Sequence, residues 1–169
     1  MTLITHAISN GCTVPRPLTS TADLLLVDEL QRDARQTNRA LANKAGLAPS
    51  TTLARVRELE QRGVLKGYHA QVDLGALGRT LQALVFVRLQ PKSDEVIEGF
   101  LEHMWALPEV IAVHLISGVE DAVIQVAVPD AETLQRVIVS EVSSYPGVFD
   151  ERTSLLFEHR RKDTITPLG

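Results

Sequence analysis

The sequence predicts an α+β protein in two parts, a three-helix domain followed by a domain with the order β-α-β-β-α-β. Helical spacing of apolar residues with short connections marks the first part, and alternation of strand-like and helix-like segments marks the second. The charge changes between them: residues 31–67 hold eight basic and three acidic residues, whereas residues 73–169 hold eight basic and fifteen acidic residues. A length of 169 residues fits one large or two small domains.

The composition excludes several other classes of protein. With 44% hydrophobic and 22% charged residues, the chain is neither disordered nor fibrous. No apolar run approaches the roughly 18 residues of a membrane-spanning helix. Residues 1–12 lack the basic start and apolar stretch of a signal peptide, so we expect a cytoplasmic protein. The single cysteine, Cys12, excludes an intrachain disulfide and a site with several thiolate ligands from one chain.

Residues 21–72 are predicted to form a helix-turn-helix domain after a flexible arm at residues 1–20. Each helical stretch begins at residues that favour a helix N-terminus. These are Thr21 or Asp23 for the first helix, Thr37 for the second, and the segment Ala48-Pro49-Ser50 for the third. Gly46 can end the second helix in a left-handed conformation. The alternating pattern of residues 64–72 predicts a wing or a connecting strand.

The third helix is predicted to carry a face that fits the major groove of DNA. At 100° per residue, Leu53, Val56 and Leu59 form its buried stripe. Small, polar and basic residues share the other face, with arginines on its flanks: Ser50, Thr51, Ala54, Arg55, Glu58, Arg57 and Arg62. Short side chains permit close approach, and arginines reach phosphates or guanine edges. The alternative for any single charged residue is an ordinary solvated face.

After a linker at residues 73–80, residues 81–160 are predicted to form a ferredoxin-like βαββαβ domain, followed by a tail at residues 161–169. The predicted strands cover residues 81–89, 110–116, 121–128 and 148–157. Ser93 and Asp130 are predicted to cap the two helices, and the first helix is expected to point Phe100 and Trp105 inward. Because both helices cover the same sheet face, the other face needs a cover, and a second copy of the chain is the simplest one.

Short segments in both domains, taken in order, resemble the Lrp/AsnC (feast/famine) transcriptional regulators over residues 21–160. In the first domain the segments are Leu30-Gln31-Arg32-Asp33-Ala34-Arg35, Leu41-Ala42, Gly46-Leu47, Ser50, Arg55-Val56-Arg57-Glu58-Leu59-Glu60, Gly63-Val64 and Gly67-Tyr68. In the second they are Pro108-Glu109-Val110, Ser117-Gly118-Val119-Glu120-Asp121, Val128-Pro129-Asp130 and Pro146-Gly147-Val148. Each segment is weak by itself, and the resemblance rests on their combined order and spacing.

The resemblance implies a sequence-specific DNA-binding transcriptional regulator that responds to an amino acid or a similar small metabolite. It further implies no cofactor, and self-association into dimers and larger discs such as octamers. The implied contacts with double-stranded DNA are Arg39, Ser50, Thr51, Thr52, Arg55, Arg57 and Lys66. The implied effector contacts are Gly118, Val119, Glu120, Asp121, Thr153, Ser154 and Leu155.

Glu120 departs from the family pattern, which usually has an aromatic residue before the aspartate. A second carboxylate at this turn favours a cationic effector such as a basic amino acid, or else indicates that no effector binds. Asp121 can pair with the ammonium group of an effector, or it can be a structural cap of the turn. Ala34 replaces the usual glycine of another turn, which alanine can occupy if φ is negative there.

The sequence contains no motif that points to catalysis or to a metal. The five histidines show no pair at metal-ligand spacing, and neither a phosphate-binding loop nor a nucleophile elbow is present. Two alternatives to a regulator are an enzyme like the sirohaem decarboxylases, with His114 and His103 as candidates, and a sensing domain with vestigial DNA binding. The presence of Ser50, Arg55 and Arg57 argues against the second alternative.

Overall fold

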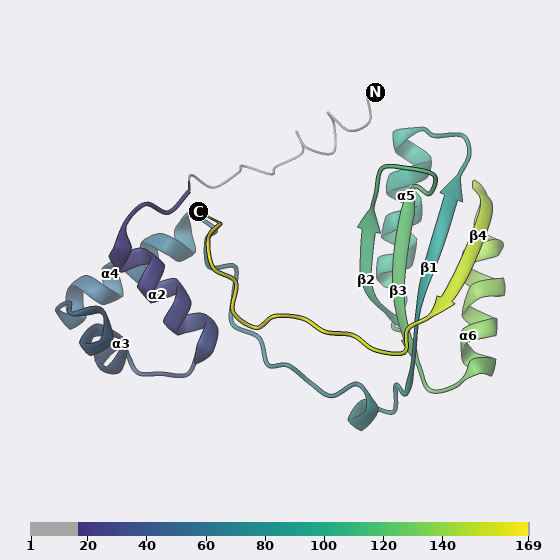
Figure 1. Ribbon diagram of the computed structural model, residues 1–169. Helices are drawn as coiled ribbons and strands as arrows, with labels where there is room; N and C mark the ends of the chain where they lie inside the picture. Colours follow the sequence, from purple (N-terminus) through teal and green to yellow (C-terminus); the bar gives the residue numbers. More distant parts are fainter. Residues whose placement is uncertain (1–16, 169) are drawn as a thin grey trace. The chain divides into compact units, whose positions relative to one another are not determined.

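The computed structural model describes residues 17–168, which divide into two compact units (Figure 1). The sheet unit comprises residues 71–159, and the three-helix unit comprises residues 17–70 together with residues 160–168. The chain therefore passes between the units twice. Most of the predicted arm, including Cys12, lies outside the described residues. No helix among residues 17–168 is both long and apolar enough to cross a membrane.

The three-helix unit contains α2 (Thr21–Arg32), α3 (Asn38–Ala45) and α4 (Pro49–Gln61). Four leucines contributed by all three helices form its buried core: Leu26, Leu30, Leu41 and Leu59. The caps of α3 are as predicted, because Thr37 accepts a hydrogen bond from the Ala40 N–H and Gly46 has a φ of 64°. The predicted cap of α2 was wrong. Ser20 caps that helix by accepting from the Asp23 N–H.

Helix α4 buries a different stripe from the one that its apolar residues predict. Leu53 is 41% exposed, whereas the Thr52 side chain is fully buried. At 100° per residue, Thr52 lies between Val56 and Leu59 on the inner face, and Leu53 lies at its edge. The hydroxyl of Thr52 tolerates burial because it donates a hydrogen bond to the Ala48 carbonyl at 3.1 Å.

The predicted strand at residues 64–72 is absent from the described part of the chain. Val64 and Leu65 turn back toward the core, where their N–H groups donate to the Leu59 carbonyl. The residues that follow have no neighbouring strand in their own unit. An alternating pattern can form a strand only where another strand completes the hydrogen-bond ladder.

The sheet unit has the predicted ferredoxin-like topology. Its elements are β1 (Leu81–Leu89), α5 (Asp94–Ala106), β2 (Val110–Leu115), β3 (Ala122–Val128), α6 (Ala131–Val137) and β4 (Val148–Leu155), with a short 3₁₀ helix at Gly75–Leu77 before them and a π-helical segment at Ile138–Ser143 after α6. The strands lie in the order β2-β3-β1-β4, and every neighbouring pair is antiparallel. Ser93 and Asp130 cap α5 and α6 as predicted, through the Val96 and Thr133 N–H groups.

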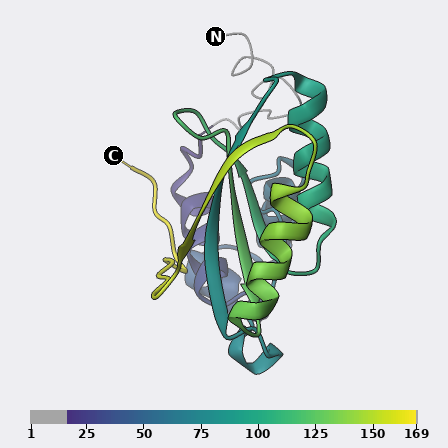
Figure 2. The same cartoon turned by 90° about the vertical axis from the view of Figure 1, so that its right-hand side faces the viewer.

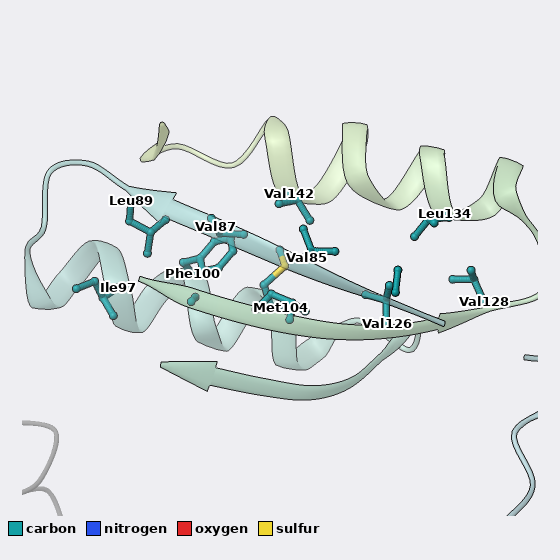
Figure 3. Packing of buried hydrophobic residues seen from close by; sticks show 13 residues of the cluster. Val85, Val87, Leu89, Ile97, Phe100, Met104, Val126, Val128, Leu134 and Val142 are labelled. Atoms are coloured by element: carbon teal, nitrogen blue, oxygen red, sulfur yellow. The ribbon is translucent and has the colours of Figure 1, made fainter. Parts of the chain in front are cut away.

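Both helices of the sheet unit cover the same face of the sheet (Figure 2). Phe100 and Met104 of α5 are fully buried against Val85 and Val87 of β1, as the close view of the core shows (Figure 3). Trp105 does not join them: it is 68% exposed, so the prediction that it points inward was wrong. On a helix, residue 105 lies about 100° from Met104 and is therefore turned away from the sheet.

The opposite face of the sheet carries apolar side chains that no helix or strand among residues 71–159 covers. Leu84 and Phe86 alternate with the buried residues of β1 and are half-buried. The Arg152 guanidinium from β4 lies over the Phe86 ring, 4.7 Å from its centre. This open face agrees with the reasoning behind the predicted dimer, but the structure contains one chain, so the dimer stays a prediction.

Phe100 should dominate the stability of the sheet unit. We expect Phe100→Ala to lower the free energy of unfolding by about 3–5 kcal/mol, because it leaves a cavity between α5 and the sheet. The matched variant Phe157→Ala, at a side chain that is 95% exposed, should change it by less than about 0.5 kcal/mol. Urea unfolding followed by the fluorescence of the only tryptophan, Trp105, measures both. Equal losses in the two variants would contradict the packing described here.

Candidate functional site

Helix α4 presents one line of side chains directly away from the core of the three-helix unit. Ser50, Ala54, Arg57 and Gln61 are all exposed. At 100° per residue they fall within about 60° of one another, opposite Thr52 and Leu59. The line contains two short side chains, one guanidinium and one amide, which is a combination suited to close contact with base edges and phosphates. Sequence reasoning missed Gln61, although its spacing of i+11 from Ser50 places it on this line.

Arg55 lies on another side of α4 and already has a partner. Its Nη1 atom donates to Asp23 Oδ1 of α2 at 2.8 Å, and the Asp23 side chain is only 13% exposed. A charge that is so nearly buried needs an opposite charge. The ion pair thus ties α4 to α2, and it directs the guanidinium of Arg55 away from the outward line.

One further hydrogen bond and a proline define the start of α4. Asn38 of α3 donates from Nδ2 to the Pro49 carbonyl at 2.8 Å. Pro49 occupies the first turn of α4, where the missing N–H group costs nothing. These contacts set the angle at which α4 leaves the turn.

The remaining predicted DNA contacts divide into exposed and buried residues. Arg39, Thr51 and Lys66 are exposed, on α3, on the first turn of α4 and after α4. Thr52 is buried and hydrogen-bonded within its own helix, so its side chain is not available at the surface. The segment around Lys66 is held against α4, because the Tyr68 hydroxyl donates to Glu60 at 3.1 Å. The pKa of Tyr68 is raised above its usual value, mainly because the phenol is partly buried and secondly because of this hydrogen bond.

The turn between β2 and β3 contains the first group of predicted effector residues. Gly118 has a φ of 144°, a conformation that side chains rarely adopt, and a Cβ atom there would meet only open space. Val119 is 72% exposed. The turn closes through a hydrogen bond from the Ile116 N–H to the Asp121 carbonyl at 2.9 Å. Exposed backbone at a turn of this kind is accessible to a small polar ligand.

The Asp121 carboxylate is occupied within the sheet unit. Its Oδ2 atom accepts from the buried Leu89 N–H at 2.9 Å, and its Oδ1 atom accepts from Lys92 Nζ at 2.7 Å. The Asp121 N–H donates to the Val87 carbonyl at the same end of β1. Asp121 therefore joins the turn to the end of β1. Lys92, which sequence reasoning missed, brings a half-exposed ammonium group to this turn.

Glu120 also has a cationic partner. Its Oε1 atom accepts from Arg152 Nη2 of β4 at 3.1 Å. The side chain of Glu120 is 25% exposed and that of Arg152 is 65% exposed. Each carboxylate of the turn is thus paired with one cation. The excess negative charge that the sequence suggested at this turn is balanced in the structure.

The second group of predicted effector residues lies away from this turn. Thr153, Ser154 and Leu155 pair with Val85, Leu84 and Ala83, whereas the turn adjoins the other end of β1 at Leu89. Ala83, the partner of Leu155, lies four positions from Val87, or about 13 Å along β1, whereas Val85, the partner of Thr153, lies two positions away, or about 7 Å. Adjacent side chains on β4 also point to opposite faces of the sheet. Of the three residues, Leu155 lies farthest from the turn, and the side chains of Thr153 and Ser154 leave opposite faces of the sheet.

The histidines considered for catalysis do not converge on one site. His114 is exposed on β2, and its register partner Val123 places it on the open face of the sheet. His103 lies on α5, on the helix side of the sheet, with Nε2 at 3.2 Å from Glu141 and its ring beside Tyr145. Among residues 17–168, no cluster of three or more His, Cys, Asp or Glu side chains could hold a metal ion.

Comparisons with known families match both units. Residues 20–66 match the model of a winged helix-turn-helix DNA-binding domain, and residues 82–165 match that of the Lrp/AsnC ligand binding domain. Together with the fold, these matches define a DNA-binding regulator with a ligand-binding domain.

Individual proteins agree with these matches. The chain is 39% identical to the HTH-type transcriptional regulator AldR of Mycolicibacterium smegmatis, over 78% of this chain and 77% of that protein. It is 33% identical to the leucine-responsive regulatory protein of Klebsiella pneumoniae, over 80% and 83% of the two chains. A transcriptional regulator of Neisseria meningitidis, solved as a complex with L-Met, has the same fold, with a TM-score of 0.80 and 24% identity over 89% of this chain and 97% of that one. The chain belongs to the Lrp/AsnC family of transcriptional regulators.

The hydrogen bond from Leu89 to Asp121 should be measurable as stability. We expect Asp121→Ala to lower the free energy of unfolding of the sheet unit by about 1–3 kcal/mol, because it leaves the buried Leu89 N–H without an acceptor. Asp150→Ala serves as the control, since that carboxylate is 61% exposed and lies 3.8 Å from Arg88. Removal of the Asp150 carboxylate should lower the free energy of unfolding by less than about 0.5 kcal/mol. Urea unfolding followed by Trp105 fluorescence compares them, and equal stability of both variants would rule out a structural role for Asp121.

Arg55 and Arg57 should differ in their effect on folding. Arg55→Ala leaves Asp23 nearly buried and unpaired, and we expect a loss of about 1–3 kcal/mol in the three-helix unit. Arg57→Ala removes an exposed side chain and should change stability by less than about 0.5 kcal/mol. Unfolding followed by far-UV circular dichroism tests this difference. A stable Arg55→Ala variant would mean that the ion pair contributes nothing to the position of α4.

Proposed function

We propose that α4 is the recognition helix and that Ser50, Thr51, Arg57 and Gln61 contact operator DNA. The observation that carries this assignment is the outward line of exposed side chains on α4. Arg57 can donate two hydrogen bonds to guanine, and Gln61 can pair with adenine in the same way. Arg39 and Lys66 flank α4 as exposed cations and supply phosphate contacts. Arg55 acts indirectly, through its ion pair with Asp23.

We further propose that the regulator binds DNA as a dimer formed through the open face of the sheet unit. Leu84 and Phe86 give that face the apolar area that a self-complementary interface needs. A dimer would place two copies of α4 in successive major grooves, about 34–36 Å apart, on a pseudo-palindromic operator. Larger assemblies such as octamers would follow from contacts between dimers.

The effector that best suits the turn is a zwitterionic α-amino acid. Lys92 and Arg152 supply cations for a carboxylate, and Asp121 and Glu120 supply carboxylates for an ammonium group. The pairing of Glu120 with Arg152 removes the reason for expecting a basic amino acid. Two facts support an amino acid as the class of effector: the match of residues 82–165 to a ligand-binding domain, and a relative that is named for its response to leucine.

We infer a regulatory protein without catalytic activity, and we place it in the cytoplasm, the compartment that holds the DNA of the bacterial relatives named above. The relatives named above are transcriptional regulators, and they support the first inference. The separation of His103 and His114 on opposite sides of the sheet gives no support to a decarboxylase site.

DNA binding is tested by fluorescence anisotropy with a duplex from the region upstream of the protein's own gene, across a range of salt concentrations. Arg57→Ala should weaken binding by about 1–3 kcal/mol, or roughly five- to 150-fold. Arg136→Ala is the charge-matched control in the sheet unit, and it should bind like the wild type. No preference of the wild type for this duplex over a random one would refute the proposed function. Equal binding by Arg57→Ala would refute the assignment of α4.

The effector is tested by repeating the titration with each of the twenty amino acids. We expect at least one neutral amino acid to change the affinity of the wild type for DNA. Lys92→Ala should reduce that change at least tenfold, since the variant removes one of the two cations near the turn while leaving α4 intact. A response only to lysine or arginine would favour the cationic effector. Its persistence in Lys92→Ala would place the effector elsewhere.

A further inference from the structure

The C-terminal segment, residues 160–168, is part of the three-helix unit although it follows the sheet unit in sequence. The chain leaves β4 after Leu155 and returns to the helices of the first unit (Figure 1). Neither the helix-turn-helix fold nor the proposed DNA contacts require this segment. Its association with the helices therefore needs a separate explanation.

The Gln31 side chain of α2 binds the segment by two hydrogen bonds. Gln31 of α2 donates from Nε2 to the Ile165 carbonyl at 3.1 Å, and the Ile165 N–H donates to Gln31 Oε1 at 2.9 Å. Both backbone groups of Ile165 are thus satisfied by one amide. A primary amide with a donor and an acceptor side by side can do this, whereas a carboxylate or an ammonium group cannot. The pair links residues that are 134 positions apart in the chain.

Helix α2 contacts both other helices of the unit and helps to fix the position of α4. Glu29 of α2 pairs with Lys44 of α3, and Asp23 of α2 pairs with Arg55 of α4. Leu26 and Leu30 of the same helix complete the core with Leu59 of α4. A displacement of α2 therefore acts on α4 through both ion pairs and packing.

We propose that residues 160–168 are a strap that couples the sheet unit to the DNA-binding helices through the contact between Gln31 and Ile165. The regulatory part of this proposal rests on the proposed function. Ile165 lies only ten positions after Leu155, the end of β4, and ten Cα–Cα steps span at most about 36 Å. The strap adds a second, short connection to the one formed by residues 71–80. A change at β4 on effector binding would then be transmitted to α2.

Hydrogen exchange of the full-length protein, read by mass spectrometry, tests whether the strap is docked. We expect the C-terminal peptide to exchange roughly five- to tenfold faster in Gln31→Ala than in the wild type, because both hydrogen bonds to Ile165 are lost. Gln31→Glu should be intermediate, since it keeps only the acceptor. The control is Asn43→Ala. Asn43 is exposed on α3, and among residues 17–168 its side-chain amide makes no hydrogen bond, so this variant should match the wild type. Equal exchange in all four proteins would overturn the proposal.

The coupling is tested by adding the operator duplex to the same proteins. Linkage is reciprocal, so DNA bound to α4 should slow exchange in β4 of the wild type and of Asn43→Ala. In Gln31→Ala this effect on β4 should be lost, while the affinity for DNA stays within about twofold of the wild type. Protection of β4 that persists in Gln31→Ala, or that is absent from the wild type, would overturn the coupling. A loss of affinity above tenfold would do the same, since it would make Gln31 a residue of the fold.

The exchange experiments without and with DNA separate failure of this proposal from failure of the proposed function. A wild type that binds no DNA would refute the proposed function, and with it the coupling. The exchange comparison without DNA would still decide whether the strap is docked.

Discussion

The attachment of α4 to α2 is the constraint on which the DNA-binding part of this protein depends. An isolated helix of thirteen residues is marginal in water and has no preferred outward face. Leu59 and the buried Thr52 fix one side of α4, and the ion pair between Arg55 and Asp23 fixes a second side. The outward line that includes Ser50 and Arg57 follows from these contacts. Arg55, at the centre of the helix, thus fixes the position of α4, whereas Arg57, two residues later, is the arginine that we propose to contact DNA.

Charge pairing also determines the arrangement of the turn between β2 and β3. Both of its carboxylates are paired with cations from other segments, Asp121 with Lys92 and Glu120 with Arg152. Ion pairs whose members differ in exposure, as both of these do, leave one partner accessible to a ligand of opposite charge. A zwitterion could exchange with such pairs without leaving a carboxylate unpaired, which a ligand of single charge could not do. This is the physical ground for an amino acid as effector.

The contact between Gln31 and Ile165 gives the architecture a property that a helix-turn-helix joined by one linker would lack. The chain joins the units covalently before β1, and the segment after β4 adds a second link that closes only through the hydrogen bonds between Gln31 and Ile165. The hydrogen bonds of one amide are weak enough to open and close. A reversible connection of this strength is what a regulatory protein requires, because a permanent one could not respond to a ligand.

Local patterns in the chain were sufficient to predict most of the fold. Helical spacing, the caps Thr37, Ser93 and Asp130, and the order of strands and helices depend on neighbouring residues, and the structure agrees with them. Contacts between distant residues decided the rest. The burial of Thr52, the exposure of Trp105 and the partners of Arg55, Glu120 and Asp121 all depend on segments far away in the sequence. Periodicity shows which residues share a face, but only packing determines where that face points and which charges meet on it.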